Sequence, residues 1–163
     1  MGKLIEIEQD LTKIQQGVIL HGCNTKGVMG FGQSLALRSA FPMIFPPYRS
    51  YCQIAMKMGR NILGRVIEVQ IEDKDLYVLN GLTQKDYGVD GKVYADINAI
   101  ERVVDHAAEF ASFLKIPLYT TKIGCGFGGL KWEDVSKVVQ AAADKHDIDI
   151  NVCNKPKTEP LDD

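Results

Sequence analysis

The chain has 163 residues, of which 45% are hydrophobic and 25% are charged, and its formal net charge is −2. This length is enough to bury one hydrophobic core and lies in the usual range of a single domain. The slightly negative charge supplies no overall positive field to attract nucleic acid, so a nucleic-acid scaffold is disfavoured.

The cysteines and the first residues indicate a cytoplasmic protein with free thiols. Cys23, Cys52, Cys125 and Cys153 are far apart in the sequence, and none has the spacing of a zinc site. The chain begins with acidic residues among the apolar ones, unlike a secretory leader, and no apolar run is long enough to span a bilayer. We therefore expect a monomer in the cytoplasm, with no bound metal, no cofactor and no membrane partner.

Strand-like and helix-like patterns alternate in the first half of the chain. Apolar and polar side chains alternate over residues 3–8, as in a half-buried strand, and residues 17–21 form an apolar run typical of a buried strand. A turn is expected at residues 10–12 between them. Helical patterns follow over residues 32–40 and again after Pro47.

The second half of the chain continues this alternation. The expected elements are two strands joined by a charged turn, a long helix with one apolar face, a strand, a helix and a last strand: residues 65–71, 76–82, 97–114, 118–123, 132–145 and 148–153. This order predicts a three-layer α/β/α sandwich around a mixed, mostly parallel sheet. We expect residues 1–154 to form the domain. Residues 155–163, which are charged and contain two prolines, are expected to be a flexible tail.

Two glycine-rich loops stand where ligands are commonly bound in α/β folds. Residues 22–32 follow one predicted strand, residues 124–130 follow another, and each loop leads into a helix. Free amides and the helix dipole favour an anion at such a place. One such loop often only turns the chain, but two in one small domain favour phosphate binding. Neither loop has the pattern of a P-loop NTPase or of a conventional dinucleotide dehydrogenase.

Four segments resemble the macro domain family, in the branch that contains the ADP-ribose 1''-phosphate phosphatases and the terminal ADP-ribose glycohydrolases. They are residues 8–11, 18–24, 27–32 and 122–132, and the resemblance extends to about Cys153. It implies that the protein binds ADP-ribose and hydrolyses ADP-ribose 1''-phosphate to ADP-ribose and phosphate. A reader that binds ADP-ribose without turnover, and a hydrolase that removes ADP-ribose from macromolecules, are the alternatives.

The resemblance also implies a role for individual residues. Asp10 matches an acidic residue that accepts a hydrogen bond from the adenine amino group, although it could merely cap the turn that follows. Asn24 matches an asparagine that meets the distal ribose, although a loop asparagine often only turns the backbone. Phe127 matches a side chain against that ribose, and packing explains it nearly as well. The full set of expected ligand-binding residues is Asp10, Leu11, Asn24, Gly27, Met29, Gly30, Phe31, Gly32, Ile123, Gly124, Cys125, Gly126, Phe127 and Gly128.

Asn24 and His21 are the candidate catalytic residues. The imidazole of His21 could act as acid or base at the 1'' position, or it could be a structural, hydrogen-bonded histidine. Side chains alternate along a strand, so the two residues need not face the same way unless the backbone turns at Gly22. A helix N-terminus near Cys125 can lower the pKa of its thiol, but no arginine follows as in the cysteine phosphatases, which favours packing.

Two departures from the resemblance argue against a glycohydrolase. The glycohydrolase that releases ADP-ribose from glutamate has a catalytic aspartate where this chain has Gly128, and its partner lysine aligns with Gln84 or, after a one-residue slip, with Lys85. The first loop also lacks the G-G-G-V-D type run of the commoner mono-ADP-ribosyl hydrolases. The polar segment 81–88 could border the pocket, with Tyr87 over the ligand.

Overall fold

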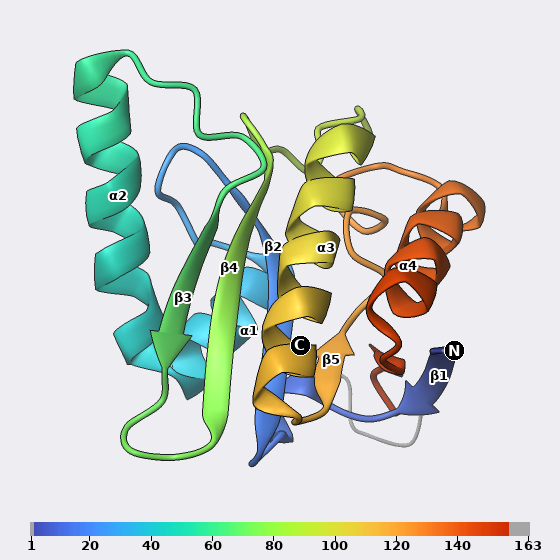
Figure 1. Cartoon of the computed structure of the whole chain (residues 1–163). Helices are drawn as coiled ribbons and strands as arrows, with labels where there is room; N and C mark the ends of the chain where they lie inside the picture. The colour runs from blue at the N-terminus through green and yellow to red at the C-terminus, as the bar shows by residue number, and fades with distance from the viewer. Residues whose placement is uncertain (1, 157–163) are drawn as a thin grey trace.

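The computed structural model describes residues 2–156, so most of the predicted flexible tail lies outside the described residues. One sheet of six strands, in the order β1-β6-β5-β2-β4-β3, forms the middle layer (Figure 1). Neighbouring strands run parallel except for β3, which pairs antiparallel with β4 at one edge. The strands are β1 (Leu4–Glu8), β2 (Gly17–Asn24), β3 (Val66–Gln70), β4 (Leu76–Gln84), β5 (Leu118–Thr120) and β6 (Ile150–Asn154).

Helices cover both faces of this sheet. One side carries α1 (Gly32–Ala40) and α2 (Phe45–Met58), and the other carries α3 (Ile97–Leu114) and α4 (Trp132–His146) (Figure 1). Two short 3-10 helices, η1 (Leu11–Lys13) and η2 (Pro42–Ile44), complete the elements. The prediction of a three-layer α/β/α sandwich with a mixed, mostly parallel sheet is therefore confirmed. None of the described helices is long and apolar enough to cross a bilayer.

Strand β2 lies between two cores, because its side chains alternate between the two faces of the sheet. Val18 and Leu20 pack with the α3 and α4 side chains, whereas Ile19 packs with those of α1 and α2. All three side chains are completely buried. A strand buried on both faces appears as a continuous apolar run, and this is why the pattern at residues 17–21 was informative.

Several strand ends differ from the prediction, and three of them have a local reason. β2 continues to Asn24 because its last residues pair with the end of β4. β5 ends at Thr120, three residues earlier than expected, because the chain turns at residues 121–123, where the Ile123 amide donates to the Thr121 carbonyl. β6 begins at Ile150 because Asp147, at φ 51°, ends α4 in the left-handed region.

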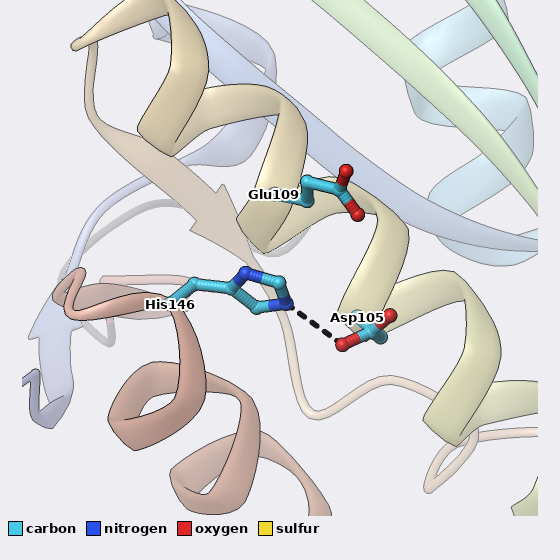
Figure 2. A group of neighbouring side chains, drawn as sticks. All are labelled: Asp105, Glu109 and His146. Atoms are coloured by element: carbon cyan, nitrogen blue, oxygen red, sulfur yellow. Dashed lines mark hydrogen bonds and ion pairs between the residues drawn. The ribbon is translucent and has the colours of Figure 1, made fainter.

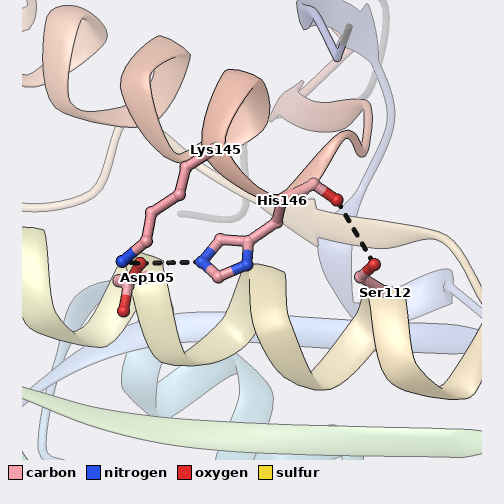
Figure 3. Close-up of polar contacts among 4 residues, drawn as sticks. All are labelled: Asp105, Ser112, Lys145 and His146. Atoms are coloured by element: carbon pink, nitrogen blue, oxygen red, sulfur yellow. Dashed lines mark hydrogen bonds and ion pairs between the residues drawn. The ribbon is translucent and has the colours of Figure 1, made fainter.

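A polar contact joins α3 to α4 on the outer face. Asp105 Oδ1 on α3 accepts hydrogen bonds from His146 Nε2 at 2.7 Å and from Lys145 Nζ at 2.9 Å, both on α4 (Figure 3). Ser112 Oγ donates to the His146 carbonyl at 3.3 Å. Figure 2 shows Glu109 next to this pair, and the ligand-type atoms of Asp105, Glu109 and His146 lie within 4.8 Å of one another. Three such residues could hold a metal ion, but the Lys145 ammonium already donates a hydrogen bond to the Asp105 carboxylate. We therefore interpret the group as a contact between the two helices.

We expect Asp105→Asn to lower the free energy of unfolding by about 0.5–1 kcal/mol at pH 7 and to change it little at pH 3. Burial alone raises the pKa of Asp105, but hydrogen bonds and charge from Lys145 and His146 outweigh it and hold the pKa below its ordinary value. A depressed folded-state pKa stabilises the fold above the unfolded pKa, and that stability disappears as the pH falls through the folded pKa. Urea unfolding at both pH values tests this.

The matched control for this substitution is Asp73→Asn, in the exposed turn between β3 and β4. It should leave unfolding unchanged at both pH values. An equal loss at pH 7 and pH 3 for Asp105→Asn would contradict the electrostatic origin of the contact.

Candidate functional site

A cavity of about 720 Å³ opens at the carboxyl ends of β2 and β6, between the two glycine-rich loops. Its wall includes residues 30–34, which contain the start of α1, and the second loop at residues 121–128. Lys122 and Lys155 lie on this wall, and none of the described residues that line the cavity is an aspartate or a glutamate. The Lys122 ammonium is paired with Glu6, at 3.7 Å between Nζ and Oε1. What favours an anion at this cavity is the lack of a carboxylate among the described lining residues, together with the backbone amides of the loops.

Most of the predicted site residues meet at this cavity. Those that line it are His21, Asn24, Gly30, Phe31, Gly32, Ile123, Gly124, Cys125, Gly126, Phe127 and Gly128. Asp10, Leu11, Gly27 and Met29 are not part of the wall. The side chains of Leu11 and Met29 lie in the core on the α1 and α2 side of the sheet, at 2% and 1% exposure. Packing therefore uses both side chains, and a ligand contact at these two positions stays a prediction.

Asp10 caps η1 and lies near the β6 end of the cavity. Its Oδ1 accepts from the Thr12 amide at 2.9 Å and from Thr12 Oγ1 at 2.7 Å. Burial raises the pKa of Asp10, but the Thr12 bonds and the charges of Lys13 and Lys155 outweigh it, so the pKa is lowered. Among the described residues both bonds end on Oδ1, which leaves Oδ2 as an acceptor. The capping role is therefore present, and the adenine contact stays a prediction.

Asn24 organises the first loop. Its Oδ1 accepts hydrogen bonds from the Lys26 amide at 2.9 Å and the Val28 amide at 3.3 Å. The Tyr48 hydroxyl lies 2.7 Å from the Asn24 main-chain carbonyl and 2.9 Å from its Oδ1. Its Nδ2 donates to the Val28 carbonyl at 2.8 Å. The pairing of β2 with β4 shifts register between Cys23 and Asn24, so the side chain faces the loop that follows. One amide proton of Nδ2 remains for a ligand.

His21 is a buried, neutral imidazole with a defined tautomer. It is 1% exposed, and burial lowers its pKa to about 4, although the hydrogen bond with Asn80 partly opposes that shift. Its Nε2 lies 2.5 Å from Asn80 Oδ1, while Asn80 Nδ2 donates to the Ile44 carbonyl at 3.1 Å. A carbonyl oxygen can only accept, so the hydrogen-bond network assigns the proton to Nε2 and leaves a lone pair on Nδ1.

The start of α1 lacks a side-chain cap. Its N-cap residue is Phe31, which makes no capping hydrogen bond, and Gly32, Gln33 and Ser34 of the first turn line the cavity. The first amides of a helix have no partner within the helix, and the helix dipole adds partial positive charge there. The backbone amides of this first turn are therefore hydrogen-bond donors at the cavity wall that no N-cap side chain satisfies.

The second loop is held in place through Gly128. Its carbonyl accepts hydrogen bonds from the Tyr94 amide at 2.9 Å and from the Ala95 amide at 3.0 Å. A Cβ added at Gly128 would lie 2.6 Å from the Gly124 carbonyl oxygen and 2.9 Å from Ala95 Cβ. Even an alanine does not fit there without movement of the backbone, so the aspartate of the glycohydrolase pattern has no room.

Aromatic rings from three separate segments gather beside the cavity. The Phe31 ring lies 5.7 Å from the Phe127 ring in an edge-to-face arrangement and 5.6 Å from the Tyr87 ring. Phe31 and Phe127 line the cavity and remain 37% and 51% exposed. Tyr87 therefore contacts a ring of the cavity wall without being part of the wall, and its position over a ligand stays a prediction.

The cysteine of the second loop, Cys125, is not activated. Burial raises the pKa of the Cys125 thiol more than the charge of Lys122 lowers it, so the thiol stays protonated at neutral pH. The four cysteines are free thiols. The packing interpretation of Cys125 is the one that agrees with this environment.

Two polar side chains of the site, Ser34 and Asn80, were not among the predicted residues. Ser34 Oγ on α1 lies 3.3 Å from His21 Nδ1, and Asn80 is fully buried on β4. An asparagine in the apolar run of β4 was a signal, since buried amides need partners. Ser34 gave no signal, because a polar residue in the first turn of a helix is common.

Comparison with known proteins agrees with this architecture, although no family model matches the chain. A DNA ADP-ribosyl glycohydrolase of Mycobacterium tuberculosis (strain ATCC 25618 / H37Rv) is 30% identical over 145 residues, which are 86% of this chain and 39% of that protein. The chain thus spans about two fifths of the length of this relative. An ADP-ribose 1''-phosphate phosphatase of Scheffersomyces stipitis is 28% identical over 160 residues, with 86% and 90% of the two chains covered.

Solved structures have the same fold. The macrodomain of Mycobacterium tuberculosis DarG superimposes with a TM-score of 0.77 at 22% identity, over 96% of this chain and 100% of that one. Thermosipho africanus DarTG in complex with ADP-ribose gives a TM-score of 0.73 at 21% identity, over 99% of this chain and 43% of that one.

Proposed function

Because this chain belongs to the macro domain family, we propose that it binds ADP-ribose and hydrolyses ADP-ribose 1''-phosphate to ADP-ribose and phosphate. The observation that carries the proposal is the cavity wall, where the uncapped start of α1 meets described lining residues that include no carboxylate. Such a wall suits a ligand with several phosphates. It also lacks the carboxylate nucleophile that a glycosidic bond cleavage through a covalent intermediate requires.

The proposed ligand follows the wall from β6 to α1. The adenine lies at the Asp10 and Lys155 end, where a carboxylate can accept from its amino group. The diphosphate lies on the second loop, and the distal ribose lies between Asn24 and Phe127. The terminal phosphate then meets the uncapped start of α1, where the amides of Gly32 and its successors replace solvent.

The proposed reaction depends on orientation and on backbone donors. The first-turn amides of α1 stabilise the charge on the phosphoryl oxygens, which a rigid, water-excluding site does at little reorganisation cost. Asn24 holds the first loop in its conformation and offers its remaining amide proton to the distal ribose. His21 is neutral at physiological pH, so it can accept a proton, but it is not a protonated general acid before the reaction begins.

The second candidate is removal of ADP-ribose from a macromolecule, which the 30% identity to a DNA ADP-ribosyl glycohydrolase favours. Two positions argue against it. Gly128 has no room for the aspartate of the glycohydrolase that acts on glutamate. The lysine position aligns with Gln84, whose Nε2 donates to the Asp86 carbonyl at 2.7 Å, or, after a one-residue slip, with Lys85. The match to the phosphatase also extends over 90% of that relative.

We expect purified protein to release phosphate and ADP-ribose in equal amounts from ADP-ribose 1''-phosphate. The measurement follows both products by chromatography, with an ADP-ribosylated DNA oligonucleotide as the competing substrate. Binding of ADP-ribose by calorimetry without phosphate release would leave a non-catalytic reader. Release of ADP-ribose from the oligonucleotide alone would favour the glycohydrolase.

A further inference from the structure

A chain of three polar side chains leads from the interior to the cavity wall. Asn80 on β4 contacts His21 on β2, and His21 contacts Ser34 on α1, with 2.5 Å between Asn80 Oδ1 and His21 Nε2 and 3.3 Å between His21 Nδ1 and Ser34 Oγ. Asn80 and His21 are 0% and 1% exposed, whereas Ser34 is partly exposed. His21 and Ser34 both line the cavity. The order is that of an orienting group, a base and a hydroxyl.

We propose that Ser34 and His21 form a proton relay for the attacking water in the phosphatase reaction, with Asn80 as the positioning residue of the imidazole. This proposal rests on the proposed function. Ser34 Oγ lies at the start of α1, beside the amides that would hold the terminal phosphate. A water bound between that phosphate and Ser34 is in hydrogen-bond reach of the hydroxyl.

The hydroxyl has one proton and two acceptors in reach. The Gly22 carbonyl lies at 3.1 Å and His21 Nδ1 at 3.3 Å from Ser34 Oγ. A carbonyl oxygen accepts a hydrogen bond but does not take the proton at neutral pH, whereas an imidazole nitrogen with a free lone pair can. The tautomer imposed by Asn80 leaves that lone pair on Nδ1, on the side of Ser34.

The relay is balanced in atoms and charge. The water gives one proton to Ser34 Oγ while the Ser34 hydroxyl proton moves to His21 Nδ1. The water oxygen forms a bond to phosphorus as the bond between phosphorus and the C1'' oxygen breaks, and the electron pair stays on that oxygen. The proton on His21 then returns through Ser34 Oγ to the released oxygen, which restores the neutral ring and yields ADP-ribose and phosphate.

The surroundings of His21 keep the ring unprotonated at neutral pH. Burial is the main reason that its pKa is lowered to about 4. The titratable group in contact on β2 is Cys23, and α2 brings Tyr48 and Cys52 close to Cys23; burial raises the pKa of all three, so they are uncharged at neutral pH. His21 Nδ1 can therefore accept the proton at neutral pH, and it loses this capacity as the pH falls towards 4 and the ring becomes protonated.

Ser34→Ala tests the relay, with Ser34→Thr as the variant that keeps a hydroxyl. We expect kcat of Ser34→Ala to fall about 100-fold or more, while KM changes less than about threefold and ADP-ribose affinity is retained. The acid limb near pH 4 should vanish from its kcat profile. Ser34→Thr should recover most of kcat. Ser39→Ala is the matched control, since Ser39 Oγ donates to the Leu35 carbonyl on the exposed side of the same helix.

A readout that does not need turnover is the ¹⁵N resonance of His21 Nδ1. Ser34→Ala should shift it without protonating the ring, because the loss removes only a hydrogen-bond donor. A kcat of Ser34→Ala within about threefold of wild type would overturn the relay while leaving the phosphatase intact. A phosphate trapped on Ser34 would also overturn it, since the hydroxyl would then be the nucleophile. Wild-type protein that releases no phosphate would overturn the proposed function and the relay together.

Discussion

Asn24→Ala should reduce phosphate release at least about 100-fold and weaken ADP-ribose binding in parallel. The alanine removes the oxygen that the Lys26 and Val28 amides share, whereas the Tyr48 hydroxyl keeps the main-chain carbonyl of residue 24 as its acceptor at 2.7 Å. Residues 25–28 then lose the contacts that fold them back, so the amides of the first loop no longer converge on the cavity. Turnover by product chromatography and affinity by calorimetry measure the two effects.

The same substitution should cost stability. Loss of several buried hydrogen bonds is worth about 2 kcal/mol, or about 4–8 °C in Tm for a chain of this size. Asn61→Ala is the matched control, because Asn61 Oδ1 also accepts an amide of its own loop, that of Leu63 at 3.1 Å, but in an exposed position away from the cavity. Wild-type turnover in Asn24→Ala would show that the first loop holds its shape without this side chain.

Gly128→Ala should lower the free energy of unfolding by about 1–3 kcal/mol and raise the dissociation constant for ADP-ribose at least about tenfold. The added methyl would lie 2.6 Å from a backbone oxygen, that of Gly124, so the second loop must move as a unit. This movement strains the two hydrogen bonds that the Gly128 carbonyl accepts from Tyr94 and Ala95. Thermal unfolding with and without ADP-ribose measures both effects.

Gly126→Ala provides the stability control in the same loop. A Cβ at Gly126 meets no atom within 4 Å, so its unfolding should resemble that of the wild type. Equal losses of stability in the two variants would contradict the steric explanation. They would also reopen the possibility that an aspartate at position 128 can be accommodated.

The fold could be predicted closely because its signals are local. Residues 32–40 were expected to be a helix and are α1, and the apolar run at residues 17–21 marks the most buried strand. The ends of β2 and β5 could not be predicted, because they depend on the partner strand and on a turn rather than on their own side chains. Propensity and periodicity carry no information about pairing length.

The location of the site could be predicted, but the hydrogen bonds between its side chains could not. The glycine patterns located both loops, and eleven predicted residues do line the cavity. The network of Ser34, His21 and Asn80 could not be predicted, because its members come from three elements and are 13 and 59 positions apart along the chain. Leu11 and Met29 were expected at the ligand, and the sequence did not reveal that both side chains pack into the core.

The missing cap of α1 links ligand binding to the order of the helix itself. The N-cap residue of α1 is a phenylalanine, so no capping side chain accepts a hydrogen bond from the first backbone amides of this helix. An anion bound there would act as the absent cap, so part of the binding free energy would be realised as helix stability. The bound ligand would then stabilise the first turn of α1, and this end of the domain would be most stable only while the substrate is bound.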